Sequence, residues 1–196
     1  MAEPISIDIF RNKDSEEFTS ALEKTDSKLY PGSAAAQCAA SAAAVANRAA
    51  VLVSEVNSSD EIDYIIRNTE ILRNYMVHLI DEDIKCKGPM RRALKEGGEN
   101  EIEAARHPAC AICGEIINMM VHLFDFLSAL KPFASGECLV FIRQSAYFAY
   151  CAMCVAREYV LDLASSSADE TFRFVTVREN EITFENCEKI FSEITG

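Results

Sequence analysis

An alanine-rich stretch near the amino terminus constrains the fold of this chain more than any other feature. Eleven of the seventeen residues 34–50 are alanine, and no charged residue lies between Ala34 and Asn47. Alanine is the strongest helix former and has little side-chain bulk, so such a helix lets neighbouring backbones approach closely. A surface helix would need charges for solubility. The stretch therefore predicts a central, buried helix.

The turn before this stretch reads Pro31-Gly32-Ser33 and predicts where the helix begins. Proline fixes φ, glycine permits a sharp turn, and Ser33 is a good N-cap residue. Free backbone N–H groups and the positive end of the helix dipole would lie at this turn, where they suit an anionic ligand group. The alternative is a tight turn that starts a packing helix and binds nothing.

The remainder of the sequence has helical rather than alternating periodicity. It predicts a first helix over 5–24 with a break near 12–14, a third helix from the 57–60 turn to about Cys86, and further helices over 99–130, 137–165 and 184–194. Residues 172–177 alternate briefly, as a strand does. Short loops between long helices favour antiparallel neighbours. We therefore expect residues 1–196 to form one all-α domain, an antiparallel bundle of about five or six helices.

Composition limits which molecules the chain could bind and in which cellular compartment it is expected. A net charge of −12 argues against binding to nucleic acid or to an anionic membrane surface. The most apolar windows, 108–130 and 138–164, are interrupted by charged residues, which predicts core helices rather than membrane spans. Residues 1–14 lack the apolar run of a signal peptide. Eight cysteines without such a signal predict free thiols in a reducing cytoplasm.

Two Cys-x-x-Cys motifs raise the question of a metal site. Both pairs, Cys110/Cys113 and Cys151/Cys154, lie in apolar helical patterns where residues i and i+3 merely share a face, so we interpret them as core thiols. A zinc or iron–sulfur site is the alternative. Among the histidines, His107 is the strongest functional candidate because it lies between a basic residue and a helix-breaking proline.

An acidic cluster closes the apolar stripe of the predicted third helix. Its two aspartates, Asp81 and Asp83, are two residues apart, so on a helix they point in different directions and only one is expected to face a cleft. The alternative is a solvated acidic face. The main positive cluster, residues 90–95, follows directly.

Several segments together resemble one family. The turn Ser27–Ala36 is similar to the Gly-rich turn and Ala-rich helix that open the formiminotetrahydrofolate cyclodeaminase / methenyltetrahydrofolate cyclohydrolase family, although two glycines of that turn are missing. Leu79–Asp83 resembles the family's Leu-x-Asp-x-Asp element, and 105–108 resembles its proline-containing helix. Glu137 stands where members usually carry aspartate. The resemblance covers about residues 15–165 and marks a diverged member.

The resemblance implies an all-helical subunit, usually a homodimer, with a folate site near the subunit interface. The implied reaction is hydrolysis of 5,10-methenyltetrahydrofolate to 10-formyltetrahydrofolate, or ring closure of formiminotetrahydrofolate with loss of ammonia, and no metal is expected. A carboxylate can stabilise the delocalised cation and accept a proton from water. The candidate catalytic residues are Asp83, Asp81 and Lys28. The candidate substrate-binding residues are Pro31, Gly32, Ser33, Ala34, Arg106, His107 and Glu137.

Two other functions remain open at this stage. One is a non-catalytic helical binding or assembly protein that kept the fold and lost the Gly-rich loop. The other is a metal or cluster protein that uses both cysteine pairs.

Overall fold

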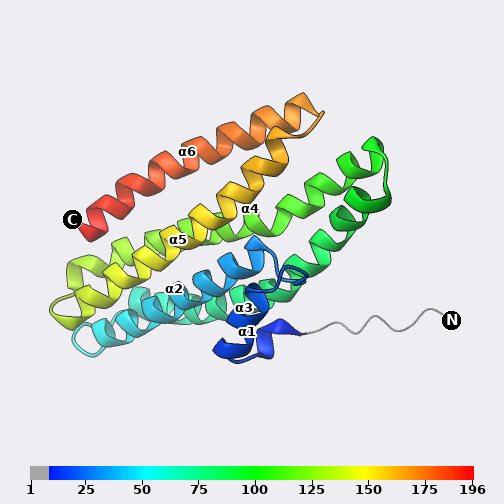
Figure 1. The fold of residues 1–196 in the computed structure, drawn as a ribbon. Coiled ribbons are helices and arrows are strands. Elements are labelled where there is room, and N and C mark those ends of the chain that lie inside the picture. Colours follow the sequence, from blue (N-terminus) through cyan, green and yellow to red (C-terminus); the bar gives the residue numbers. More distant parts are fainter. Residues whose placement is uncertain (1–8) are drawn as a thin grey trace.

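The computed structural model describes residues 9–196, and within that range every regular element is helical (Figure 1). This confirms the predicted all-α bundle. The elements in chain order are η1 (Phe10–Asn12), α1 (Ser15–Leu22), α2 (Pro31–Ser54), α3 (Asp60–Glu96), α4 (Glu99–Leu130), η2 (Lys131–Phe133), α5 (Glu137–Ser165) and α6 (Glu170–Thr195).

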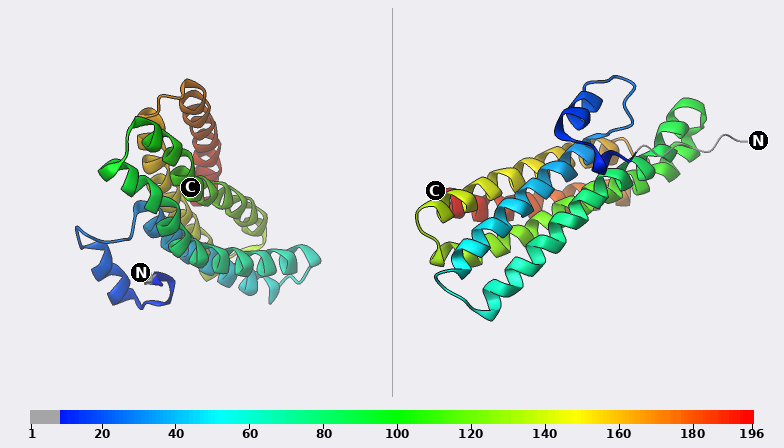
Figure 2. Two further views of the ribbon diagram at one scale, coloured as in Figure 1. Left: turned by 90° about the vertical axis from the view of Figure 1, so that its right-hand side faces the viewer. Right: turned by 90° about the horizontal axis from the view of Figure 1, so that it is seen from below.

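Helices α2 to α5 form the core of the bundle, and short turns make successive helices antiparallel (Figure 1). Helix α2 packs against α3, α4 and α5, and α6 lies on the outer side of α4 and α5 (Figure 2). Nine alanines of α2 are buried, which allows this close approach. The helix is not buried all round, because Ala44 and Val51 face solvent.

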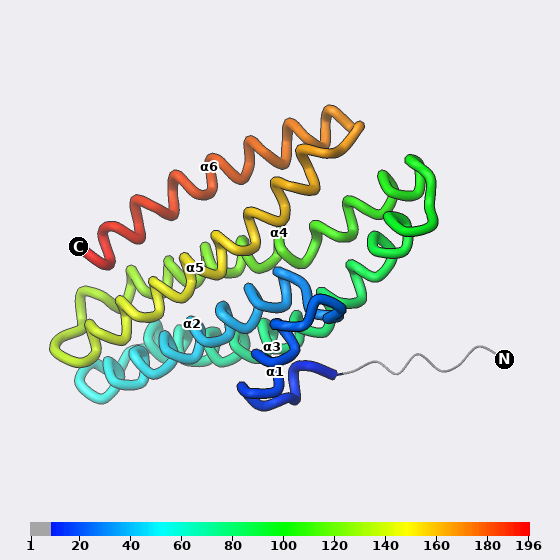
Figure 3. The backbone as a smooth tube through the Cα atoms, viewed as in Figure 1, coloured from blue at the N-terminus to red at the C-terminus, as the bar shows by residue number. Residues whose placement is uncertain are grey.

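Helix α3 is longer than the sequence predicted. It has 37 residues, about 55 Å, and it runs through Gly88 and Pro89 instead of ending near Cys86. Proline removes one helical hydrogen bond, but Met90 and Ala93 beyond it are buried, and this packing compensates for the loss. The end of α3 and the beginning of α4 therefore form a hairpin that extends past the beginning of α2 (Figure 3).

The strand predicted over 172–177 is wrong, because these residues belong to α6. The helix is held from both ends: Phe172 stacks on His107 with ring centroids 3.8 Å apart, and Phe184 and Ile194 are buried. The alternation that suggested a strand came from an exposed Phe174 beside the half-buried Phe172. The helix expected over 184–194 is the second half of the same element.

At the amino terminus, the predicted break near 12–14 is present. Helix α1 begins after Asp14, whose side chain accepts a hydrogen bond from the Glu17 N–H. Residues 5–8 of the predicted first helix lie outside the described residues.

By length and composition alone, three helical segments are apolar enough to cross a membrane: Pro31–Ser54, Glu99–Phe133 and Glu137–Ser165. The expectation that charged residues exclude the later two on composition is therefore wrong. The bundle buries 50%, 44% and 39% of the respective apolar windows. That a membrane is not a partner remains a prediction.

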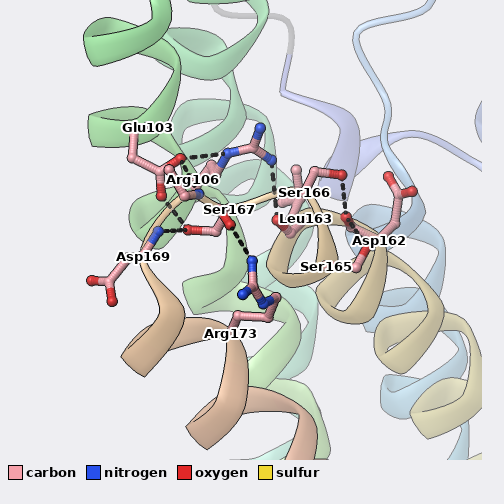
Figure 4. Close-up of polar contacts among 10 residues, drawn as sticks. Glu103, Arg106, Asp162, Leu163, Ser165, Ser166, Ser167, Asp169 and Arg173 are labelled. Atoms are coloured by element: carbon pink, nitrogen blue, oxygen red, sulfur yellow. Dashed lines mark hydrogen bonds and ion pairs between the residues drawn. The ribbon is translucent and has the colours of Figure 1, made fainter.

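A polar cluster ties the α5–α6 turn to α4 (Figure 4). Glu103 on α4 accepts hydrogen bonds from the Ser167 hydroxyl and from the Ala168 N–H at 3.1 Å, and it also pairs with Arg106. Arg106 in turn donates to the Leu163 carbonyl oxygen at 3.0 Å, near the end of α5. The hydrogen bond from the Ser167 hydroxyl lowers the pKa of Glu103 most, and the hydrogen bond from the Ala168 N–H lowers it further. The cluster fixes where α6 begins.

We predict that Glu103→Gln loosens α6 without unfolding the core. The neutral glutamine amide accepts hydrogen bonds from Ser167 and Ala168 more weakly than the glutamate carboxylate does. Hydrogen exchange of the α6 amides should accelerate relative to wild type, while exchange in α4 should not. Because the folded pKa is lowered, this stabilisation is complete above the ordinary glutamate pKa and is lost as pH falls through the folded value. The exposed Glu185→Gln on α6 is the control, and equal exchange in both variants would contradict the assignment.

Candidate functional site

The antiparallel core brings four distant parts of the sequence to one level of the bundle. The start of α2, the last third of α3, the middle of α4 and the last third of α5 meet there. The residues they contribute are Gly32 and Ser33 from α2, Asp83 and Lys87 from α3, Cys113 from α4 and Tyr159 from α5.

An ion pair between Asp83 and Lys87 is the centre of this site. The two residues are one helical turn apart on α3, and both side chains are 0% exposed. The Lys87 ammonium contacts Asp83 Oδ1, and Asp83 Oδ2 lies 2.9 Å from the Ser33 hydroxyl. Within residues 9–196, Oδ1 has this ion pair but no aligned hydrogen-bond donor. One carboxylate oxygen is thus held by charge alone.

The start of α2 is shaped to admit this carboxylate. The Ser33 hydroxyl lies within reach of Asp83 and also of the Ile80 carbonyl oxygen at 3.1 Å. A methyl group on Gly32 would overlap Asp83 Oδ1 and come within 2.8 Å of Lys87 Nζ. The prediction that Ser33 is the N-cap is wrong, since Tyr30 holds that position and Ser33 is buried inside the first turn.

Two neutral groups complete the surroundings of the Lys87 ammonium. Its Nζ lies 3.9 Å from the ring centroid of Tyr159 and 3.6 Å from Cys113 Sγ. Burial raises the pKa of Tyr159, and the negative charge of Asp83 raises it further. Burial also raises the pKa of Cys113 to about 11, although the Lys87 charge opposes the shift. Both side chains therefore stay protonated at neutral pH, so neither is an activated nucleophile.

A cavity of about 350 Å³ lies beside the ion pair, between the 22–30 segment, α3 and α5. Lys87 and Tyr159 line it on the inner side. Tyr30, Lys24 and Arg91 line it as well, and Lys24 is exposed to solvent. The cavity thus adjoins the buried pair, and the positive side chains of Lys24 and Arg91 line it.

The other two catalytic candidates have surroundings that differ from those of Asp83. Asp81 accepts hydrogen bonds from the backbone N–H groups of Phe10 at 2.8 Å and Arg11 at 3.3 Å, and it pairs with the Arg11 guanidinium. It therefore holds η1 against α3. Lys28 is exposed and lines a different hollow of about 550 Å³ along α1.

The binding candidates divide in the same way. Gly32 and Ser33 lie at the site, while Pro31 is exposed and Ala34 is half-buried next to them. Glu137 lies at the other end of the bundle, where it pairs with Arg48, about 22 Å along α2 from Ser33. The two candidates on α4 hold α6 in place. Arg106 belongs to the polar cluster at the α5–α6 turn, and His107 stacks on Phe172 of α6.

Sequence reasoning missed Lys87 and Tyr159. The signal for Lys87 was its i,i+4 spacing from Asp83, which places an acid and a base on one helical face. It was missed because α3 was expected to end at Cys86. Tyr159 had no local signal, since only the antiparallel packing of α5 brings it to α3.

All eight cysteines are free thiols. In the described part of the chain, residues 9–196, no group of three or more His, Cys, Asp or Glu side chains is placed to hold a metal ion. Cys110 and Cys113 are buried in α4, whereas Cys151 is exposed on α5.

Fold and site together define a class: an all-α bundle with a buried carboxylate and a cavity at the start of its alanine-rich helix. Residues 14–179 match the family model described as formiminotransferase-cyclodeaminase, and the chain belongs to this family. Formiminotetrahydrofolate cyclodeaminase from Thermotoga maritima has a similar structure, with a TM-score of 0.83 and 20% identity, covering 94% of this chain and 96% of that one. That likeness shows the fold. No curated protein matches the chain.

We predict that Gly32→Ala destabilises the protein by about 1–3 kcal/mol, because the added methyl group must displace the Asp83–Lys87 pair. Gly114→Ala, in the middle of α4, is the matched control. A methyl group there meets no described atom within 4 Å, and replacing a helical glycine should stabilise by about 0.5–1 kcal/mol. Chemical denaturation of both variants measures the difference. Equal stability changes would show that α2 does not pack closely on Asp83.

Proposed function

We propose that the chain is a folate one-carbon enzyme that hydrolyses 5,10-methenyltetrahydrofolate to 10-formyltetrahydrofolate, with the related cyclodeamination of formiminotetrahydrofolate as the variant reaction. The family membership supports a folate substrate. The observation that carries the proposal is the buried pair of Asp83 and Lys87, which lies against a cavity.

The chemistry needs a carboxylate at this place. Methenyltetrahydrofolate carries a cation delocalised over N5, the bridging carbon and N10. Water adds to that carbon, and Asp83 accepts the proton that the water releases. The remaining hydroxyl proton passes to N5 as the carbon–N5 bond breaks, which leaves the formyl group on N10. A buried carboxylate stabilises the cation more strongly than a solvated one does. The mechanism requires no metal.

The cavity's charges suit the rest of a folate. Arg91 and Lys24 line it, and guanidinium or ammonium groups can bind the carboxylates of a glutamate tail. Tyr30 and Tyr159 offer flat faces to a pterin ring. Lys28, the third candidate catalytic residue, lines another hollow and is not part of this proposal.

The proposal includes a homodimer, as the family resemblance implies, and a cytoplasmic location, which the free thiols support. A mass measurement in solution tests the dimer directly.

The second candidate is a non-catalytic binding or assembly protein of the same fold. One observation favours it: both members of the ion pair are 0% exposed, so Asp83 reaches a ligand only if Lys87 moves. This candidate predicts a stable dimer without folate turnover.

We predict that the protein accelerates the loss of methenyltetrahydrofolate absorbance beyond spontaneous hydrolysis. Asp83→Asn should lower kcat by at least about 100-fold, because the amide neither stabilises the cation nor accepts the proton. The exposed Glu158→Gln on α5, next to Tyr159, is the control and should retain the wild-type rate.

Two results would change the assignment. A folded, dimeric wild-type protein with no acceleration between about pH 6 and 8 would favour the non-catalytic candidate. Full activity in Asp83→Asn would move the reaction to another site.

A further inference from the structure

The surroundings of the Lys87 ammonium have the composition of a binding site for an organic cation. The Asp83 carboxylate contacts the ammonium on one side, and the face of Tyr159 lies 3.9 Å away on another. The ring of Tyr30 is further off, at 5.6 Å. Anionic and aromatic groups around one position are what cationic ligands select. We call these three residues the cation cage.

The lysine that fills the cage is attached by a flexible stem that also lines the cavity. Its side chain is 0% exposed, and the cavity of about 350 Å³ lies beside it. A four-carbon stem can therefore carry the ammonium out of the cage into this space by rotamer changes, without unwinding α3. An aspartate left alone in the cage would be a buried, unpaired charge, so the vacated state needs another cation.

We propose that the cation cage is a binding site for delocalised organic cations of the amidinium type, and that Lys87 is its resident cation, which a ligand must displace. The inference deepens the proposed function, because it rests on that function for the natural ligand, the N5–C–N10 cation of the folate. The cage itself depends only on Asp83, Tyr159 and Tyr30.

The first test removes the resident cation and supplies a free one. Lys87→Ala lacks the three outer methylenes and the ammonium, which n-propylammonium replaces atom for atom. Acetamidinium tests the delocalised N–C–N cation without any folate. At ten times its dissociation constant, either cation should raise the Tm of Lys87→Ala by about 3–6 °C relative to equal ionic strength of sodium chloride.

The matched control is the double variant Asp83→Asn/Lys87→Ala, which has no charge in the cage and should show no such shift. Neutral 1-propanol should give none in either variant. The proposal is overturned if both variants respond equally, or if Lys87→Ala responds to 1-propanol as strongly as to the cations. It is also overturned if neither cation raises the Tm of a folded Lys87→Ala.

A second measurement uses the wild-type protein, so it does not depend on how the variants fold. Acylation of lysines by an N-hydroxysuccinimide ester, followed by peptide mass spectrometry, reports when Lys87 leaves the cage. Acetamidinium should increase modification of Lys87 in a saturable way, while the exposed Lys85 should be modified equally with and without it. No increase at Lys87 would contradict displacement.

These readouts separate the inference from the proposed function. Cation binding without folate turnover would keep the cage and remove the reaction. Folate turnover without cation binding would keep the reaction and overturn the cage.

Discussion

The buried ion pair between Asp83 and Lys87 is the interaction on which the geometry of this end of the bundle depends. Removing two charges from water is expensive, and their mutual attraction offsets the cost only with good geometry and further partners. The partners here come from other helices: the Ser33 hydroxyl of α2 and the Tyr159 ring of α5. Helices α2 and α5 must therefore hold their positions and rotations closely, because a small displacement would remove the hydrogen bond or the aromatic contact that helps to stabilise the buried pair.

The alanine-rich helix makes this convergence possible. Small side chains on α2 let α3 and α5 approach from both sides, and Gly32 removes the one Cβ that would collide with Asp83. The anion expected at the start of α2 is thus supplied by the chain itself, as the Asp83 carboxylate. A helix start that could have bound an external anion instead has an internal one, whose ion-pair partner is the Lys87 ammonium.

Much of the fold could be predicted from the sequence, because its helices have strong local signals. The bounds of α4 and α5 follow from apolar periodicity, and Asp83 was among the predicted candidate site residues. Errors arose where packing overrides local chemistry: α3 continues through Pro89, and residues 172–177 are helical because Phe172 stacks on α4. The site was predicted in part only. Glu137 lies at the other end of the bundle and Lys28 lines a hollow along α1. No local pattern shows which turns of the four antiparallel core helices lie side by side.

A site that contains its own cation gains stability and loses affinity for the same reason. The bound lysine offsets the cost of burying the carboxylate in the ligand-free protein, but a ligand binds only the fraction of molecules in which the ammonium has left. If that fraction were about 1%, the apparent affinity would fall about 100-fold. A substrate can recover this loss through remote contacts, such as those between a glutamate tail and Arg91 at the cavity. Discrimination between folates and small cations would then depend on the tail-binding residues, while the cage would select for positive charge.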